Sequence, residues 1–147
     1  MAANLDMKKI DKAIYYPATD PVLVDVPPMH YLMIDGQGNP NTAPEYQTAI
    51  ETLYPLAYGV RAICKADDQP FTVMPLEGLW WFETGAPIEG DENYKDKFIW
   101  TMMIRLPDFV TEQIVEQAKV TVAKKKPGLQ LDMVRYERYE EGLSAQI

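Results

Sequence analysis

The segment LEGLWWFE, residues 76–83, constrains the fold most, because it places two tryptophans side by side. In a β-strand, neighbouring side chains point to opposite faces of the sheet. Trp80 and Trp81 therefore cannot both enter the same core. We expect one ring to pack inward and the other to face a groove. The second ring would then contact another core layer, a partner or a ligand. Which ring does which depends on the strand register, and alternation alone leaves this open.

The totals of the chain favour one soluble domain. A length of 147 residues is enough to bury a core. The net charge of −8 repels phosphate backbones, so we expect no direct contact with nucleic acid. A single cysteine, Cys64, excludes an internal disulfide framework and fits a reducing compartment. The mixed, charged first residues and the absence of a long apolar run predict a cytoplasmic protein without a membrane segment.

The order of elements indicates an α+β fold with an antiparallel sheet and helices packed on one face. The pattern predicts, in chain order, strands at 22–26 and 29–36, a helix over 42–64, a strand over 71–82 interrupted at 75–78, a strand over 97–106, a helix over 111–126 and a last strand over 133–147. Residues 1–20 are expected to be a charged lead-in, and residues 21–147 to form the domain.

Local signals refine the first helix. Thr42 and Glu45 have the spacing of a capping box, and Pro44 falls in the first turn, where its missing N–H costs nothing. Pro55 lies inside the helical stripe, so we expect a kink or a local break there.

Several classes of chemistry are excluded by the residues that the chain lacks. There is no P-loop and no GxGxxG motif. His30 is the only histidine and Cys64 the only cysteine, so the chain cannot supply a zinc cluster, and we expect neither metal nor cofactor. Ser144 is the only serine and has no histidine beside it, which excludes a Ser-His-Asp triad. Cys64 and His30 could in principle pair as a nucleophilic dyad. The favoured interpretation is that both are structural residues.

Aromatic and carboxylate side chains remain as the candidates for chemistry. If residues 79–83 and 98–104 pair as a hairpin, their rings form an aromatic-walled slot, which accepts flat, apolar or cationic molecules. The alternative for these rings is core packing, above all for Trp100. Glu77 and Glu83 flank the tryptophans, and a carboxylate held against aromatic walls favours its neutral form. The alternative for each glutamate is a solvated surface position.

Four stretches taken together resemble the GyrI-like family of small-molecule-binding proteins, in particular its stand-alone bacterial subfamily. They are HYLMIDGQGNPN (30–41), PLEGLWW (75–81), FIWTMMIRLPDFVTE (98–112) and YERYEEGLSAQ (136–146). The resemblance implies two strand-helix-strand-strand repeats, as in effector-binding domains, with a ligand groove between them. Similar proteins continue after the last stretch, whereas this sequence stops at Ile147. We therefore expect the second repeat to be incomplete.

The resemblance also implies an activity. Members of the stand-alone subfamily are cyclopropanoid cyclopropyl hydrolases, which open the cyclopropane of DNA-alkylating natural products inside an aromatic tunnel. The function expected here is binding of flat aromatic or hydrophobic molecules, with hydrolysis of such alkylators as a detoxifying step. The residues expected to carry it are Glu77 as the catalytic group and Tyr31, Trp80, Trp81, Phe98, Trp100, Glu83 and Glu141 as ligand contacts.

Two other interpretations stay open. One is a non-enzymatic effector or interaction module, related to transcription regulators or to gyrase, in which the −8 charge suits a basic partner surface. The other is a domain without a complete groove, in which an exposed sheet edge at residues 134–146 favours a homodimer by strand pairing.

Overall fold

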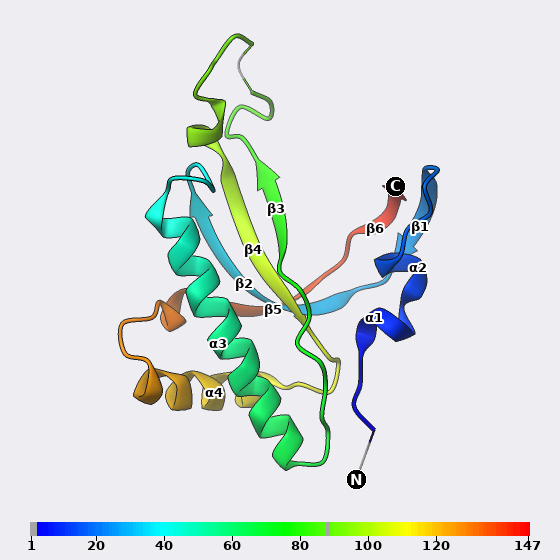
Figure 1. Ribbon diagram of the computed structural model, residues 1–147, viewed down its shortest axis with the longest axis vertical. Coiled ribbons are helices and arrows are strands. Elements are labelled where there is room, and N and C mark those ends of the chain that lie inside the picture. The colour runs from blue at the N-terminus through cyan, green and yellow to red at the C-terminus, as the bar shows by residue number, and fades with distance from the viewer. Residues whose placement is uncertain (1–2, 88) are drawn as a thin grey trace.

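A four-stranded antiparallel sheet forms the centre of the computed structural model, which describes residues 3–87 and 89–147. Figure 1 shows the architecture. The strand order is β3 (Glu77–Trp81), β4 (Ile99–Leu106), β2 (Met29–Gln37) and β5 (Arg135–Tyr139). The predicted α+β class and the predicted hairpin between β3 and β4 are both confirmed.

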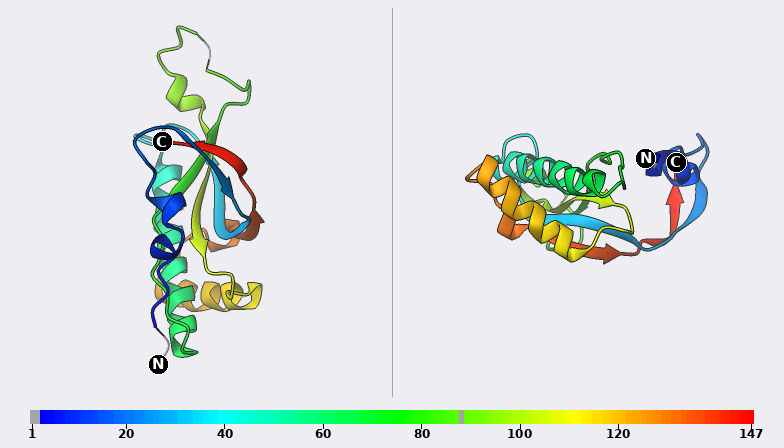
Figure 2. Two further views of the ribbon diagram at one scale, coloured as in Figure 1. Left: turned by 90° about the vertical axis from the view of Figure 1, so that its right-hand side faces the viewer. Right: turned by 90° about the horizontal axis from the view of Figure 1, so that it is seen from below.

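Two long helices lie on one side of this sheet. Helix α3 (Pro44–Ala66) packs directly on β2 and β4, and helix α4 (Glu112–Lys125) packs against α3, which it crosses near one end of the sheet (Figure 2). The shorter helices are α1 (Met7–Ile10), α2 (Lys12–Tyr15), η1 (Tyr94–Lys97) and η2 (Leu131–Met133). Within residues 3–87 and 89–147, no helix combines the length and apolarity needed to cross a bilayer.

A two-stranded sheet forms an arm on the other side of the molecule. It pairs β1 (Val22–Val26) with β6 (Gly142–Gln146). The prediction of a single last strand over 133–147 is therefore wrong: β5 pairs with β2, and β6 leaves the sheet to pair with β1. The change of direction falls at Gly142, whose φ of 70° lies in the left-handed region that glycine adopts at no steric cost.

The central sheet has a buried layer on each face. On the helix side, Leu32 and Ile34 of β2 and Trp100 of β4 join the main core with α3 and α4. On the arm side, Tyr31 and Met103 belong to a smaller core under the arm. This explains why the segment from Ile99 to Leu106 is apolar at nearly every position: its alternate side chains fill two different cores.

The register places the adjacent tryptophans on opposite faces. Trp80 pairs with Trp100 on the helix side, and Trp81 pairs with Ile99 on the arm side. Both rings are partly exposed, at 40% and 42% of their surface, because β3 is an edge strand. The sequence predicts that one ring packs inward; Trp80 is the ring on the core side, but it is only partly covered.

Helix α3 differs from its prediction in two details. Its N-cap is Ala43, without a side-chain hydrogen bond, because Thr42 belongs to the preceding turn and donates its N–H to the Asn39 carbonyl. The expected capping box with Glu45 does not form. The helix also continues through Pro55 without a break. The carbonyl four residues earlier belongs to Glu51 on the exposed face, where water can satisfy it.

The close contact between Gly36 and Trp100 yields a stability prediction. A Cβ at Gly36 would lie 2.1 Å from the Trp100 ring, in the fully buried main core. We expect Gly36→Ala to lower the free energy of unfolding by about 1–3 kcal/mol, as overpacking does. In a Trp100→Leu background, the same change should cost much less, because the smaller side chain leaves room. Urea unfolding of the four proteins measures this coupling, and equal costs in both backgrounds would contradict it.

Candidate functional site

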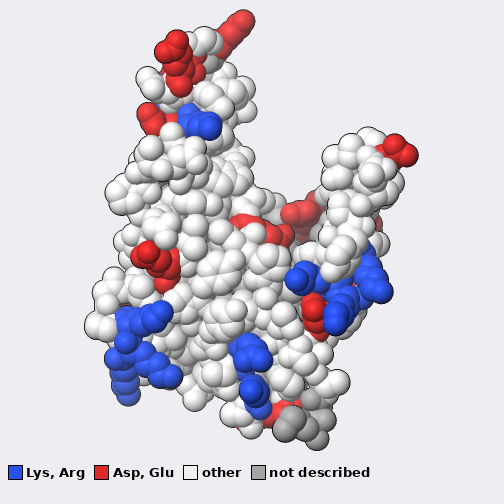
Figure 3. All heavy atoms as spheres, in the orientation of Figure 1, with Lys and Arg blue, Asp and Glu red and all other residues white. Residues whose placement is uncertain are grey.

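A cavity of about 280 Å³ lies between the sheet and the β1–β6 arm, and we call it the arm cavity. Figure 3 shows the molecule hollowed between its main body and the arm, with acidic side chains at the base of the hollow. The cavity walls come from α2, β1, β6 and the start of β3; they are Ile14, Tyr15, Val24, Val26, Pro75, Glu77, Glu141, Ser144, Ala145 and Gln146. Most of these side chains are apolar or uncharged, and the two charged ones are both carboxylates.

Glu77 is the chemically distinctive group of the arm cavity. It is the first residue of β3 and pairs with Met103, which directs its side chain to the arm side of the sheet. Its Oε2 is buried without a hydrogen-bond partner. Burial, together with the nearby carboxylate of Glu141, raises the pKa of Glu77 to about 7, although Arg105 acts in the opposite direction. Glu77 therefore titrates near neutral pH rather than in the acidic range.

Arg105 does not pair with Glu77, because the charge of Arg105 is neutralised by another carboxylate. Its guanidinium donates to Asp11 Oδ2 at 2.8 Å and to the Tyr15 hydroxyl at 3.2 Å. Both partners come from the lead-in, where Asp11 lies between α1 and α2. The lead-in is thus packed onto the domain and forms part of the wall of the arm cavity.

Tyr31 lies on the same face of the sheet as Glu77 but behind the cavity wall. Its side chain is buried in the core under the arm, 6.3 Å edge-on from Tyr139, and its hydroxyl donates to Met29 Sδ. Burial raises the pKa of Tyr31, and the carboxylates of Glu77 and Glu141 add to the increase. The phenol therefore stays neutral at physiological pH.

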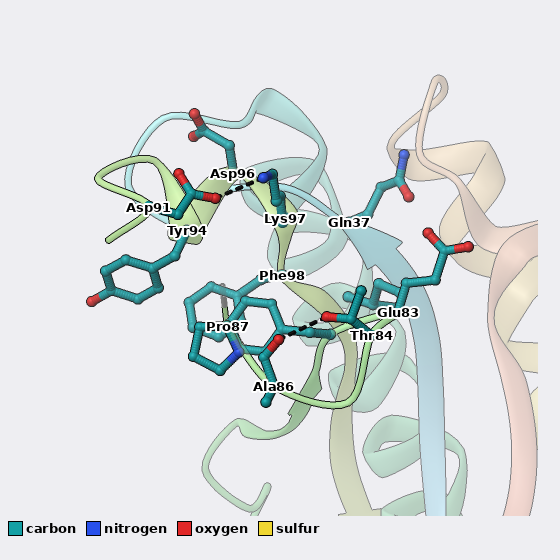
Figure 4. A pocket seen from close by; sticks show the side chains of 12 residues that line it. Gln37, Glu83, Thr84, Ala86, Pro87, Asp91, Tyr94, Asp96, Lys97 and Phe98 are labelled. Atoms are coloured by element: carbon teal, nitrogen blue, oxygen red, sulfur yellow. Dashed lines mark hydrogen bonds and ion pairs between the residues drawn. The ribbon is translucent and has the colours of Figure 1, made fainter. Parts of the chain in front are cut away.

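A second feature lies at the far end of the β3–β4 hairpin, where five rings form a continuous row. Trp80 contacts Tyr46 of α3 at 5.8 Å and Phe98 at 5.3 Å, and Phe98 stacks on Phe82 at 4.8 Å and meets Tyr94 at 6.1 Å. Part of this aromatic row borders a smaller cavity of about 220 Å³ (Figure 4). The carboxylates around that cavity are solvated or already paired, as with Lys97 and Asp91 at 2.6 Å.

The structure divides the residues predicted from the sequence into separate groups. Glu77 and Glu141 line the arm cavity, with Tyr31 behind them. Trp80 and Phe98 belong to the aromatic row, and exposed Glu83 borders the small cavity there. Trp100 is fully buried in the main core and packs against Gly36 and Tyr46.

Trp81 shares a face of β3 with Glu77, four residues further along the strand, and so lies on the opposite face from Trp80 and the aromatic row. The side chains of Glu77 and Trp81 are spaced about 13 Å apart along the strand, with Leu79 between them. An apolar surface therefore extends from the ionisable carboxyl to a partly exposed indole.

Sequence reasoning missed the contributions of Asp11, Tyr15 and Arg105. The only available signal was an arginine in a strand whose other residues, apart from Thr101, are apolar; such an arginine requires a buried partner. In the described part of the chain, no group of three or more His, Cys, Asp and Glu side chains could hold a metal ion. The arrangement offers one unpaired carboxyl, poised to give or take a proton near neutral pH, beside an apolar wall.

Comparisons with known proteins identify relatives that match nearly all of this chain. No protein-family model and no curated protein sequence matches the chain. A crystal structure of an uncharacterized conserved protein from Listeria innocua matches 97% of this chain and 70% of its own, with 38% identity and a TM-score of 0.86. Two structures described as a hydrolase from Listeria innocua also match 97% of this chain. One shares 38% identity, is covered over 68% of its own chain and has a TM-score of 0.82. The other shares 39% identity, is covered over 70% and has a TM-score of 0.85.

Identity at this level over nearly the whole chain is accompanied by the same fold. The chain therefore belongs to the same protein family as these Listeria innocua proteins.

Proposed function

We propose that this protein binds flat aromatic or hydrophobic small molecules along the arm side of β3, between Glu77 and Trp81. The observation that carries this proposal is the unpaired Oε2 of Glu77, buried beside an apolar cavity, with a pKa raised to about 7. A buried carboxyl without a partner is costly to maintain, and such groups concentrate at functional sites. Trp81 supplies an aromatic surface at the other end of the same face.

We further propose that the site hydrolyses electrophilic small rings. The description of two relatives as a hydrolase supports hydrolysis in general. The likeness of residues 30–41, 75–81, 98–112 and 136–146 to GyrI-like proteins supports, more narrowly, a cyclopropane conjugated to a carbonyl as the substrate. Detoxification of DNA alkylators is the role that this substrate class suggests.

The proposed reaction needs one proton donor and one water. The water oxygen forms a bond to a ring carbon as the strained C–C bond breaks, and the electron pair moves through the conjugated system to the carbonyl oxygen. Protonated Glu77 donates its proton to that oxygen, and the attacking water loses a proton to solvent, which restores the charge balance. General acid catalysis of this kind supplies roughly 10²–10⁴-fold in rate.

The first prediction tests which face binds the ligand. Trp81→Ala should weaken the binding of a planar aromatic cation such as ethidium roughly tenfold, because stacking on the arm side of β3 is lost. Trp80→Ala is the matched control, since the same ring is removed from the opposite face of the same strand. Calorimetric titration measures both variants. Equal affinities for the two variants would exclude the arm side as the ligand face.

The second prediction uses the pKa of Glu77 to test its burial. Between its ordinary value of 4.5 and about 7, the folded protein holds a proton that the unfolded chain releases, so rising pH favours unfolding across this window. Relative to the wild type, Glu77→Gln should therefore gain stability from pH 5 to pH 8, by up to about 3 kcal/mol.

Urea unfolding at several pH values measures this difference. Glu83→Gln removes the same charge from an exposed position of the neighbouring segment and should follow the wild type throughout. A Glu77→Gln profile parallel to that of the wild type would show that the carboxyl is solvated.

The third prediction concerns turnover. Incubation with a cyclopropane-bearing alkylator should convert it to a product heavier by one water, and kcat should fall as pH rises through about 7, because Glu77 loses its proton there. Glu77→Gln should lower kcat about 10²-fold or more and leave substrate binding intact. Mass spectrometry follows the product. Saturable binding with an unchanged mass would instead favour the non-enzymatic effector module.

A further inference from the structure

A large apolar cavity lies away from the proposed site, between α3 and α4. It measures about 630 Å³, within the range of about 300–1,000 Å³ that is typical of small-molecule sites. We call it the interhelical cleft. It shares no lining residue with the arm cavity.

A close helix crossing creates the interhelical cleft. A Cβ at Gly59 would lie 2.8 Å from Val122 Cγ2, so the two helices meet at a point where only glycine fits without rearrangement. Because α3 and α4 cross rather than run side by side, they diverge away from this contact (Figure 1). The space between them is bordered on α3 by Tyr58 and Ala62, both exposed, and by Ile63.

The charge around the interhelical cleft has one sign. No aspartate or glutamate is among its described lining residues, although the chain carries 22 acidic residues and a net charge of −8. Its only charged lining residues are Lys125 and Lys126, at the C-terminal end of α4. Within the described residues, neither ammonium is in ion-pair distance of a carboxylate. Figure 3 shows basic side chains gathered where Figure 1 places this end of α4.

We propose that the interhelical cleft binds an amphipathic carboxylate, such as a medium-chain fatty acid. The apolar chain lies between the α3 residues and Val122, and the carboxylate pairs with Lys125 and Lys126. An apolar wall that ends in two free cations complements such a ligand both in charge and in the removal of apolar surface from water. The interhelical cleft does not include Glu77. It would hold an anionic ligand, whereas the carboxylates of the arm cavity favour cations.

Decanoate and 1-decanol serve as a pair of probes, since they share the chain and differ in the charged group. Calorimetric titration of the full chain should give saturable 1:1 binding of decanoate, with weaker binding of the alcohol. Lys125→Gln/Lys126→Gln should weaken decanoate binding roughly twofold to fivefold, the range of a partly exposed ion pair, and leave the alcohol unchanged. Lys95→Gln/Lys124→Gln is the control, since it removes two exposed lysines that do not line the interhelical cleft.

The apolar part of the interhelical cleft is tested separately. Ala62→Glu places a carboxylate on its wall at an exposed helix position, and binding of both probes should fall more than tenfold. Ala66→Glu, at another exposed lining position, gives an independent second variant. Ala123→Glu adds the same charge to an exposed position of α4 outside the cleft and should bind as the wild type does.

Three outcomes would overturn the proposal: no saturable binding of decanoate, equal affinity of the wild type for acid and alcohol, or equal binding by Ala62→Glu and Ala123→Glu. A dimer in light scattering that Ala62→Glu converts to a monomer would assign the interhelical cleft to a second copy of the chain instead. Glu77→Gln should bind decanoate unchanged. The result therefore does not depend on the function proposed for the arm cavity.

Discussion

The burial of β4 on both faces is the constraint on which the rest of the structure depends. Trp100 and Met102 belong to the main core under the helices, whereas Met103 belongs to the core under the arm. A strand with two apolar faces requires a cover on each side, and the chain provides α3 on one side and the β1–β6 arm with Ile14 of the lead-in on the other. The cavity beside Glu77 is formed where the second cover meets the edge of the sheet.

The same burial determines the electrostatics of the arm cavity. Arg105 occupies the arm-side face of β4, and a buried guanidinium needs an anionic partner. Asp11 of the lead-in supplies that partner at 2.8 Å, so the charge of Arg105 is paired with Asp11 rather than with Glu77. Glu77 then keeps its desolvation penalty without full compensation, and its pKa rises as a result.

Local sequence signals predicted the sheet better than they predicted the site. The hairpin of β3 and β4 and the two faces of β4 follow from alternation, which depends only on neighbouring residues. The split between β5 and β6 does not, because it depends on the left-handed backbone of Gly142 and on a partner strand more than a hundred residues away. Thr42 and Glu45 satisfy the spacing of a capping box, but the turn at Asn39 places the N-cap one residue later. The pairing of Asp11 with Arg105 likewise has no local pattern.

The position of β3 at the sheet edge explains how one strand can contribute both to a core and to the proposed binding surface. An interior strand would bury its side chains on both faces, as β4 does, and an edge strand leaves them partly accessible. Glu77 is covered because the arm reaches the start of β3, whereas Trp81 stays exposed because the arm does not extend to its other end. Alternation places both on the arm side, together with Leu79. An ionisable carboxyl in a low-dielectric setting and an accessible indole thus share one face without any special backbone geometry.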